Sequence, residues 1–140
     1  PQVAFVGAIG QPDAHAGELP IAHVELIAGA TVSVEELLAY AQEHIKERAA
    51  HPKHIEIMAE LPKTAVGKIF KPDLRKMAIK RIYNHALHSG GIAASVVDVV
   101  EDKKRGLVAQ LERSGTATDD DVMKALGSFT HPWVWKGEEE

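Results

Sequence analysis

The sequence predicts an α+β fold, in which a small mixed sheet with helices is followed by a β-hairpin and helix extension. Three observations lead to this prediction. Short apolar runs with strand-like alternation recur along the chain, amphipathic segments of helical spacing lie between them, and one of these segments opens on a clear helix-start signal. The expected order is β-β-α-β-loop-α, and the hairpin and a last helix follow.

The first two strands are expected at the beginning of the chain. The apolar run Val3–Ile9 ends at residues 10–13 (Gly-Gln-Pro-Asp), which is typical of a buried strand that runs into a turn. In residues 21–27, apolar side chains alternate with His23 and Glu25, and this alternation predicts a half-exposed strand.

The first helix has the clearest start in the sequence. Ser33 and Glu36 stand at the spacing of a capping box. The helix should stop near Ala50, because His51 precedes Pro52 and the residue before a proline disfavours helical dihedral angles. The expected inward stripe consists of Val34, Leu37, Leu38, Ala41 and Ile45.

The rest of the chain supplies the remaining elements. Residues 55–60 alternate as a third strand does, and a second helix is expected from about Pro72 to the glycine pair at 90–91. A hairpin is expected within residues 94–111, and Thr118 is expected to cap the last helix.

Composition limits the classes of function. The chain has 140 residues, 45% hydrophobic and 26% charged, which is typical of one folded domain or of one domain with a small appendage. Its net charge of -4 argues against a nucleic-acid partner. The absence of cysteine excludes disulfides and thiolate zinc sites.

The beginning of the chain indicates a fragment of a longer protein. It opens on Pro1, directly at a strand-like run, and has no signal-peptide pattern. No apolar run approaches the roughly 20 residues that span a bilayer. We therefore expect a cytoplasmic protein.

The segment Leu61–Ile69 (Leu-Pro-Lys-Thr-Ala-Val-Gly-Lys-Ile) is the strongest candidate for chemistry. Gly67 allows a sharp turn directly before Lys68, so the loop presents a flexible ammonium group that could reach phosphate or carboxylate oxygens. The segment is not a phosphate-binding P-loop, because Pro62 stands where the first glycine belongs. From physical chemistry alone, solvated loop lysines are the more common reading of Lys63 and Lys68, since charged loop residues usually lie on the surface.

Residues 60–69 resemble the Pro-Lys-Thr-x-x-Gly-Lys-Ile signature of the C-terminal domain of adenylate-forming enzymes, which include acyl-CoA synthetases, luciferases and peptide-synthetase adenylation domains. The resemblance covers about residues 2–76. Further matching segments are the Gly-x-Pro-Asp turn at 10–13, the pair Gly17-Glu18, the helix at 33–45 and residues 52–56.

The resemblance implies part of an ATP-dependent acyl-CoA synthetase, in which a carboxylate and ATP form acyl-AMP and CoA then forms the thioester. It implies Lys68 as the catalytic lysine of adenylation. The cofactor-binding residues that it implies are Lys63, Thr64, Gly67, Gly17 and Glu18, with no metal ligand in this chain. ATP and Mg²⁺ would be bound mainly by an N-terminal AMP-binding domain of the same polypeptide, so the isolated fragment is expected to be inactive.

Two departures from the family pattern affect this interpretation. Many relatives have a Tyr-Lys pair where this chain has Ala49-Ala50, which puts a CoA contact from that lysine in doubt. The chain also continues far beyond the motif. We expect residues 1–76 to form the C-terminal domain and residues 77–140 to form an extension packed on it, which resembles the tail of some bacterial fatty-acyl-CoA synthetases.

Other residues are expected to be structural. His85 and His88 stand three apart on a predicted helix but have no further metal ligands beside them, so we expect surface roles. Trp133 and Trp135 are expected to dock on the core. A second hypothesis, from a different class of function, is a non-catalytic interaction module in which the extension pairs two copies into a homodimer.

Overall fold

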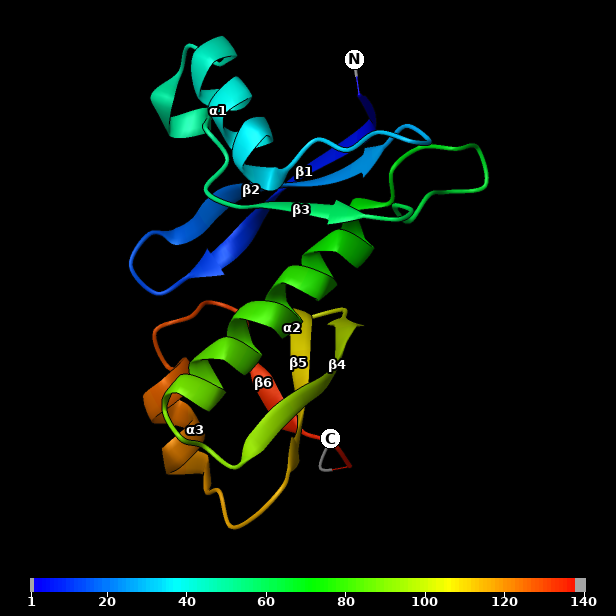
Figure 1. Cartoon of the computed structure of the whole chain (residues 1–140). Coiled ribbons are helices and arrows are strands. Elements are labelled where there is room, and N and C mark those ends of the chain that lie inside the picture. The colour runs from blue at the N-terminus through cyan, green and yellow to red at the C-terminus, as the bar shows by residue number, and fades with distance from the viewer. Residues whose placement is uncertain (1, 138–140) are drawn as a thin grey trace. The chain divides into compact units, whose positions relative to one another are not determined.

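The computed structural model describes residues 2–137 and has the predicted α+β class (Figure 1). Pro1 and the acidic end at 138–140 lie outside the described residues. The chain divides into two compact units, the first with residues 2–11 and 19–75 and the second with residues 12–18 and 76–137. None of the helices within residues 2–137 is long and apolar enough to cross a membrane.

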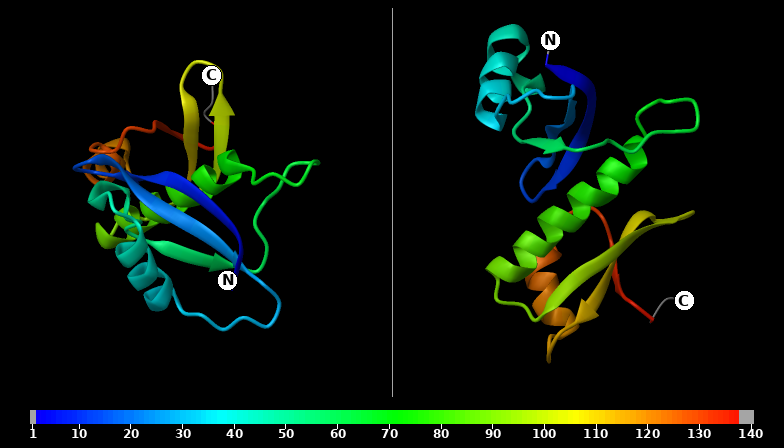
Figure 2. Two further views of the ribbon diagram at one scale, coloured as in Figure 1. Left: turned by 90° about the horizontal axis from the view of Figure 1, so that it is seen from above. Right: turned by 45° about the vertical axis from the view of Figure 1, so that its right-hand side comes forward.

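The first unit is built on a three-stranded sheet with the order β1-β2-β3 (Figure 2). Its strands are β1 (Val3–Asp13), β2 (Gly17–Leu26) and β3 (Ile55–Met58). β2 and β3 are parallel, and their register pairs Ala22 with Ile55 and Glu25 with Met58. The predicted third strand is therefore confirmed, although it ends at Met58 rather than Glu60.

The turn predicted at residues 10–13 is wrong, because β1 continues through them to Asp13. The chain turns at residues 14–16, where the Asp13 carboxylate accepts hydrogen bonds from the backbone N–H groups of His15 and Ala16 at 3.0 and 2.8 Å. Pro12 is compatible with a strand here, since β1 is at the edge of the sheet and a proline is tolerated on an edge.

β2 is buried on both faces, so the predicted half-exposed pattern is wrong for this strand. Ala22 and Val24 pack with side chains of the first helix, whereas His23 points to the opposite face and is only 1% exposed. The reason is that the other face of this sheet is packed as well, since Gly7 of β1 lies against the fully buried Leu74, which alternation within one strand does not reveal.

Helix α1 (Val34–His44) begins as predicted and ends earlier. Ser33 Oγ accepts a hydrogen bond from Glu36 N at 3.2 Å. The helix ends because Ile45 is extended, and the free carbonyl of Ile45 lies 2.6 Å from the His51 ring nitrogen Nε2. A short 3₁₀ turn, η1 (Arg48–Ala50), occupies the residues that the sequence assigned to the end of the helix.

Gly7 in β1 allows the first turn of helix α2 (Lys71–Ser89) to pack closely against the sheet of the first unit. A Cβ atom at position 7 would lie 2.4 Å from Cδ1 of Leu74 and 3.0 Å from Cγ2 of Ile69. Leu74 is fully buried, so it has little room to move. The close approach therefore requires glycine.

The second unit combines the remainder of α2 with a second three-stranded sheet. The predicted hairpin is confirmed as β4 (Ala94–Asp102) and β5 (Gly106–Arg113), which are antiparallel. A short strand, β6 (Trp133–Trp135), adds to β5 in the parallel direction and was not predicted. The buried core residues of this unit are Ile79, Tyr83, Leu87, Ala94, Val96, Val99, Ala109, Leu111, Ala117, Val122, Leu126 and Trp135.

Helix α3 (Asp119–Leu126) starts with a complete capping box between Thr118 and Asp121, as predicted for a Thr118 cap. Docking of Trp135 is also confirmed. Its indole Nε1–H donates to Asp119 Oδ1 at 2.6 Å, and the Arg113 guanidinium lies 3.8 Å from a centroid of its ring system. These contacts connect β5, α3 and β6 around one side chain.

The substitution Gly7→Ala is expected to destabilise the protein by about 1–3 kcal/mol, because the added methyl overlaps Leu74. Urea unfolding followed by circular dichroism measures the change. In the double variant Gly7→Ala/Leu74→Ala the overlap is removed, so the two losses should not add. Simple additivity would contradict the assigned close contact.

The substitution Tyr83→Phe should lower the free energy of unfolding by about 1 kcal/mol, since the buried Tyr83 hydroxyl donates to the carbonyl of His131 at 2.8 Å. Denaturant titration of the whole chain, with the unfolding of the second unit as the signal, tests this value. Tyr40→Phe is the matched control, because Tyr40 is 56% exposed and should tolerate the same change. Equal effects at both positions would refute the structural role of the Tyr83 hydroxyl.

Candidate functional site

The lysine loop, residues 61–70, is a small ordered hairpin between β3 and α2. Its backbone is closed by three hydrogen bonds, from Thr64 N to Lys68 O at 2.7 Å, from Gly67 N to Thr64 O at 2.9 Å and from Phe70 N to Pro62 O at 2.8 Å. Gly67 adopts a left-handed φ of 82°, which L side chains rarely adopt. The predicted role of Gly67 in a sharp turn is therefore confirmed.

Lys68 follows this turn and is exposed. Its backbone is fixed on both sides, because Lys68 O accepts from Thr64 N and Lys68 N donates to Thr64 Oγ1 at 3.3 Å. The flexible side chain thus starts from an ordered backbone position. The Thr64 hydroxyl, for which the resemblance implies cofactor binding, makes this bond within the loop.

Lys63 is held by the sheet of the first unit. Its ammonium donates to Glu25 Oε1 at 2.7 Å and lies 4.5 Å from the centre of the Phe5 ring. The same carboxylate oxygen of Glu25 accepts from the backbone N–H of Leu61 at 2.8 Å. Neither Glu25 nor Phe5 was singled out as a site residue from the sequence, since they precede the loop by dozens of residues.

The Glu25 carboxylate has a pKa below its ordinary value of 4.5. The main cause is the hydrogen bond from the Lys63 ammonium, and the hydrogen bond from Leu61 N contributes in the same direction. Both donors favour the ionised carboxylate. Glu25 and Lys63 are only 15% and 20% exposed, so solvent screens this ion pair less than a pair on an open surface.

Gly17 and Glu18 lie at the start of β2, beside the turn that follows β1. Gly17 has a φ of 81°, and Glu18 is exposed. These two residues belong to the second unit, whereas Lys63, Thr64, Gly67 and Lys68 belong to the first. The candidate site therefore consists of the lysine loop and the residues that hold it.

Metal ligands do not gather anywhere within residues 2–137. No group of three or more histidine, aspartate or glutamate side chains in this part of the chain could hold a metal ion. His85 and His88 are exposed on α2, in agreement with the surface roles expected for them.

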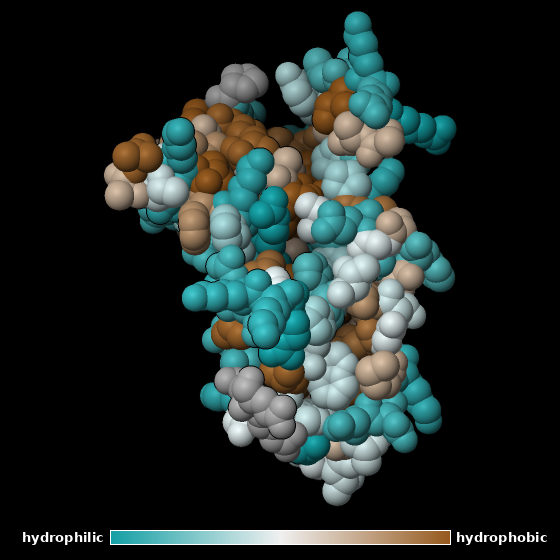
Figure 3. All heavy atoms as spheres, turned by 180° about the vertical axis from the view of Figure 1, so that it is seen from behind, coloured by the Kyte–Doolittle hydropathy of each residue, from teal (hydrophilic) through white to brown (hydrophobic). Residues whose placement is uncertain are grey.

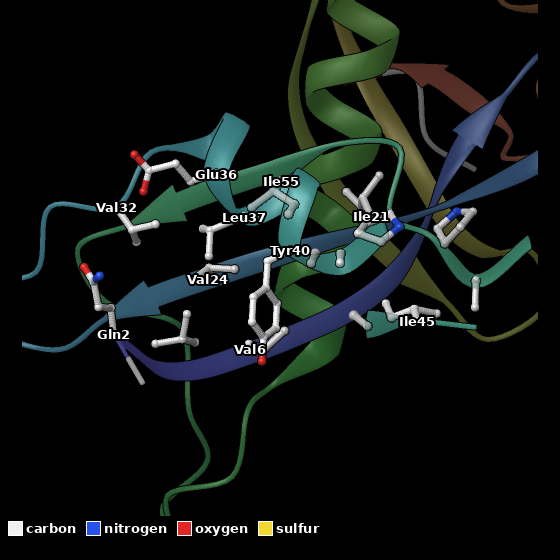
Figure 4. A pocket seen from close by; sticks show the side chains of 17 residues that line it. Gln2, Val6, Ile21, Val24, Val32, Glu36, Leu37, Tyr40, Ile45 and Ile55 are labelled. Atoms are coloured by element: carbon white, nitrogen blue, oxygen red, sulfur yellow. The ribbon is translucent and has the colours of Figure 1, made fainter. Parts of the chain in front are cut away.

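An apolar pocket in the first unit was missed by the sequence analysis. It has a volume of about 540 Å³ and lies between α1 and the sheet, where Val6, Val24, Leu37, Tyr40 and Ile55 line it (Figure 4). Large apolar side chains of this unit are also exposed, among them Phe5, Val6, Ile27 and Tyr40. Apolar residues gather in the upper part of the view in Figure 3. The pocket contains none of the lysine-loop residues.

Known proteins similar to this chain share one kind of domain. Residues 1–68 match the family described as the AMP-binding enzyme C-terminal domain. The chain is 39% identical over 127 residues to a marinolic acid–CoA ligase of Pseudoalteromonas sp. (strain SANK 73390), a match that covers 90% of this chain and 19% of that protein. It is 42% identical over 81 residues to an acetyl-coenzyme A synthetase of Pyrobaculum arsenaticum, covering 56% of this chain and 12% of that protein.

Among solved structures, the chain resembles apo MatB from Rhodopseudomonas palustris, with a TM-score of 0.50 and 31% sequence identity. This match covers 54% of the chain and 15% of MatB. The chain thus spans about a fifth or less of the length of the proteins that it resembles.

Acid should weaken the hold of Glu25 on the lysine loop. Because the folded-state pKa of Glu25 is lowered, its contribution to stability is complete above about pH 4.5 and is lost as the pH falls through the folded-state pKa. Carboxyl ¹³C NMR should give a Glu25 midpoint below 4.5, and the Leu61 amide shift should follow it. In Lys63→Met the midpoint should return toward 4.5, whereas a wild-type midpoint at or above 4.5 would contradict the ion pair.

Proposed function

This chain belongs, through residues 1–68, to the family of AMP-binding enzyme C-terminal domains, and from that premise we propose that it is the mobile C-terminal domain of an ATP-dependent acyl-CoA synthetase. In this role it supplies the lysine of adenylation. The observation that carries the proposal is the lysine loop, which presents the exposed Lys68 side chain from a backbone fixed by hydrogen bonds.

The similar proteins support a CoA ligase. The two relatives described above are named as a CoA ligase and an acetyl-CoA synthetase, and each is several times longer than this chain. The partner of the chain would therefore be an N-terminal AMP-binding domain of the same polypeptide. A long-chain-fatty-acid–CoA ligase of Bacillus subtilis is 41% identical over 76 residues, which places fatty acids among the candidate carboxylic acids.

We assign residues 1–76 to the C-terminal domain and residues 77–140 to its extension. The match to the Pseudoalteromonas ligase supports including the extension in the enzyme, because a match over 90% of the chain must contain most of residues 77–140. The shorter matches, to 54–59% of the chain, are consistent with relatives that share only the first part.

In the proposed first step, an oxygen of the substrate carboxylate attacks the α-phosphorus of ATP. The bond from that phosphorus to the bridging oxygen breaks, and the products are acyl-AMP and pyrophosphate. Negative charge that develops on the phosphoryl oxygens would be stabilised by the Lys68 ammonium. In the second step, the thiolate sulfur of CoA attacks the acyl carbon, the bond from that carbon to the phosphate oxygen breaks, and AMP leaves.

ATP and Mg²⁺ are proposed to be held mainly by the N-terminal domain. Residues 2–137 offer no cluster of three or more side chains that could hold a metal, so no metal-binding role is assigned to this chain. Gly17 and Glu18 remain proposed contacts on the thioester-forming side. Without the N-terminal domain, we expect the chain to catalyse neither step.

Replacement of Lys68 by alanine in the full-length ligase should slow adenylation by about 10²–10³-fold, since a charge that acts in the transition state is removed. Thioester formation from supplied acyl-adenylate and CoA should stay near the wild-type rate. Rapid-quench assays of the two half-reactions measure both rates separately.

Lys71→Ala is the matched control, because Lys71 is also exposed and lies three residues further along the chain. It should leave both rates within about twofold, as surface substitutions usually do. An unchanged adenylation rate in Lys68→Ala would remove Lys68 from the mechanism, and an equal loss in both half-reactions would indicate a defect of folding or docking.

A further inference from the structure

Glu25 connects the sheet of the first unit to the lysine loop through a single atom. Its Oε1 accepts from Leu61 N at 2.8 Å and from Lys63 Nζ at 2.7 Å, although the loop lies 36 and 38 residues further along the chain. We propose that Glu25 is a positioning residue that, together with Lys63, fixes the backbone from which Lys68 reaches the substrates. This inference rests on the function proposed above.

The contacts form a continuous path from Glu25 to Lys68. The carboxylate holds residues 61 and 63 on both sides of Pro62. Lys63 pairs with Ile69 across the base of the loop, and Phe70 N donates to the carbonyl of Pro62. One step nearer the tip, Thr64 bonds to Lys68 through its backbone N–H and its hydroxyl. Each step is a direct hydrogen bond or a pair across the hairpin. If the base of the loop is released from Glu25, the backbone of Lys68 at the tip is therefore held less firmly.

A second strand helps to hold the base. The Lys63 ammonium lies 4.5 Å from the Phe5 ring of β1, in addition to its bond with Glu25 of β2. It also lies 3.4 Å from the carbonyl of Leu61. The carboxylate, the aromatic ring and the carbonyl oxygen each attract a cation, so together they stabilise the Lys63 ammonium at this position. We therefore assign Lys63 to the support of the loop instead of the ligand contact that the family resemblance implied.

The first test measures the loop in the chain itself. Glu25→Met removes the acceptor oxygen but keeps an unbranched side chain of similar length. Amide hydrogen exchange at Thr64, Gly67, Lys68 and Phe70 should accelerate by roughly tenfold, because the base of the loop opens more often. Glu25→Gln retains a neutral acceptor and should give an intermediate result.

The matched control is Glu56→Met, the same change on the neighbouring strand β3, where Glu56 is paired in register with His23. It should leave the exchange of the loop amides unchanged. If Glu25→Met also leaves them unchanged, the inference is overturned. Should Glu25→Met fail to fold, Lys63→Met removes the same ion pair from the other side and should reproduce the faster exchange.

The second test asks whether Glu25 acts through Lys68 in the full-length ligase. Glu25→Met should slow adenylation by roughly 10–100-fold, as expected for a misplaced catalytic group, and should leave thioester formation unchanged. In a Lys68→Ala background it should cause no further loss beyond about twofold, because the side chain that it positions is already absent.

The outcomes separate this inference from the proposed function. If the adenylation losses of Glu25→Met and Lys68→Ala multiply in the double variant, the positioning role is overturned while Lys68 stays in the mechanism. The same holds if Glu25→Met slows both half-reactions equally. If Lys68→Ala alone has no effect on adenylation, the proposed function fails instead. The exchange measurement would still decide whether Glu25 holds the loop.

Discussion

The parallel pairing of β2 with β3 determines where the lysine loop begins. In this register Glu25 is opposite Met58, the last residue of β3, and the chain reaches Leu61 three residues later. The carboxylate of Glu25 is then close enough to accept hydrogen bonds from the entry of the loop. A shift of the register by one residue would turn Glu25 to the other face of the sheet and remove both bonds. The register of β2 and β3 therefore also determines the geometry at the entry of the loop.

Local signals in the sequence were reliable where a local interaction forms the element. Ser33 and Thr118 start helices as their side chains indicated, and both make the expected bonds to backbone N–H groups. The end of α1 was missed, because it depends on a contact between the His51 ring and the Ile45 carbonyl. The burial of His23 was missed because it depends on both faces of the sheet being packed, which involves residues far along the chain such as Leu74.

The candidate site was predicted only in part, for a similar reason. The motif at 61–69 indicated a turn at Gly67, and the family resemblance pointed to Lys68. Nothing in the sequence connects Glu25 or Phe5 with Lys63, since these pairs become neighbours only after the sheet has formed. Long-range polar contacts of this kind carry no periodic signal. The strand formed by Trp133–Trp135 was missed for the same cause, because its partner β5 lies more than twenty residues earlier.

The two tryptophans have a consequence for how the chain can be observed. Trp133 and Trp135 are the only tryptophans of the 140 residues, and both lie in β6 of the second unit. The Trp135 indole is buried, bonded to Asp119 and stacked with Arg113, so its emission reports the packing of that unit. The unit that contains the lysine loop has no such chromophore. Tryptophan emission therefore follows the extension, and the unit that holds Lys68 has no tryptophan of its own to report events there.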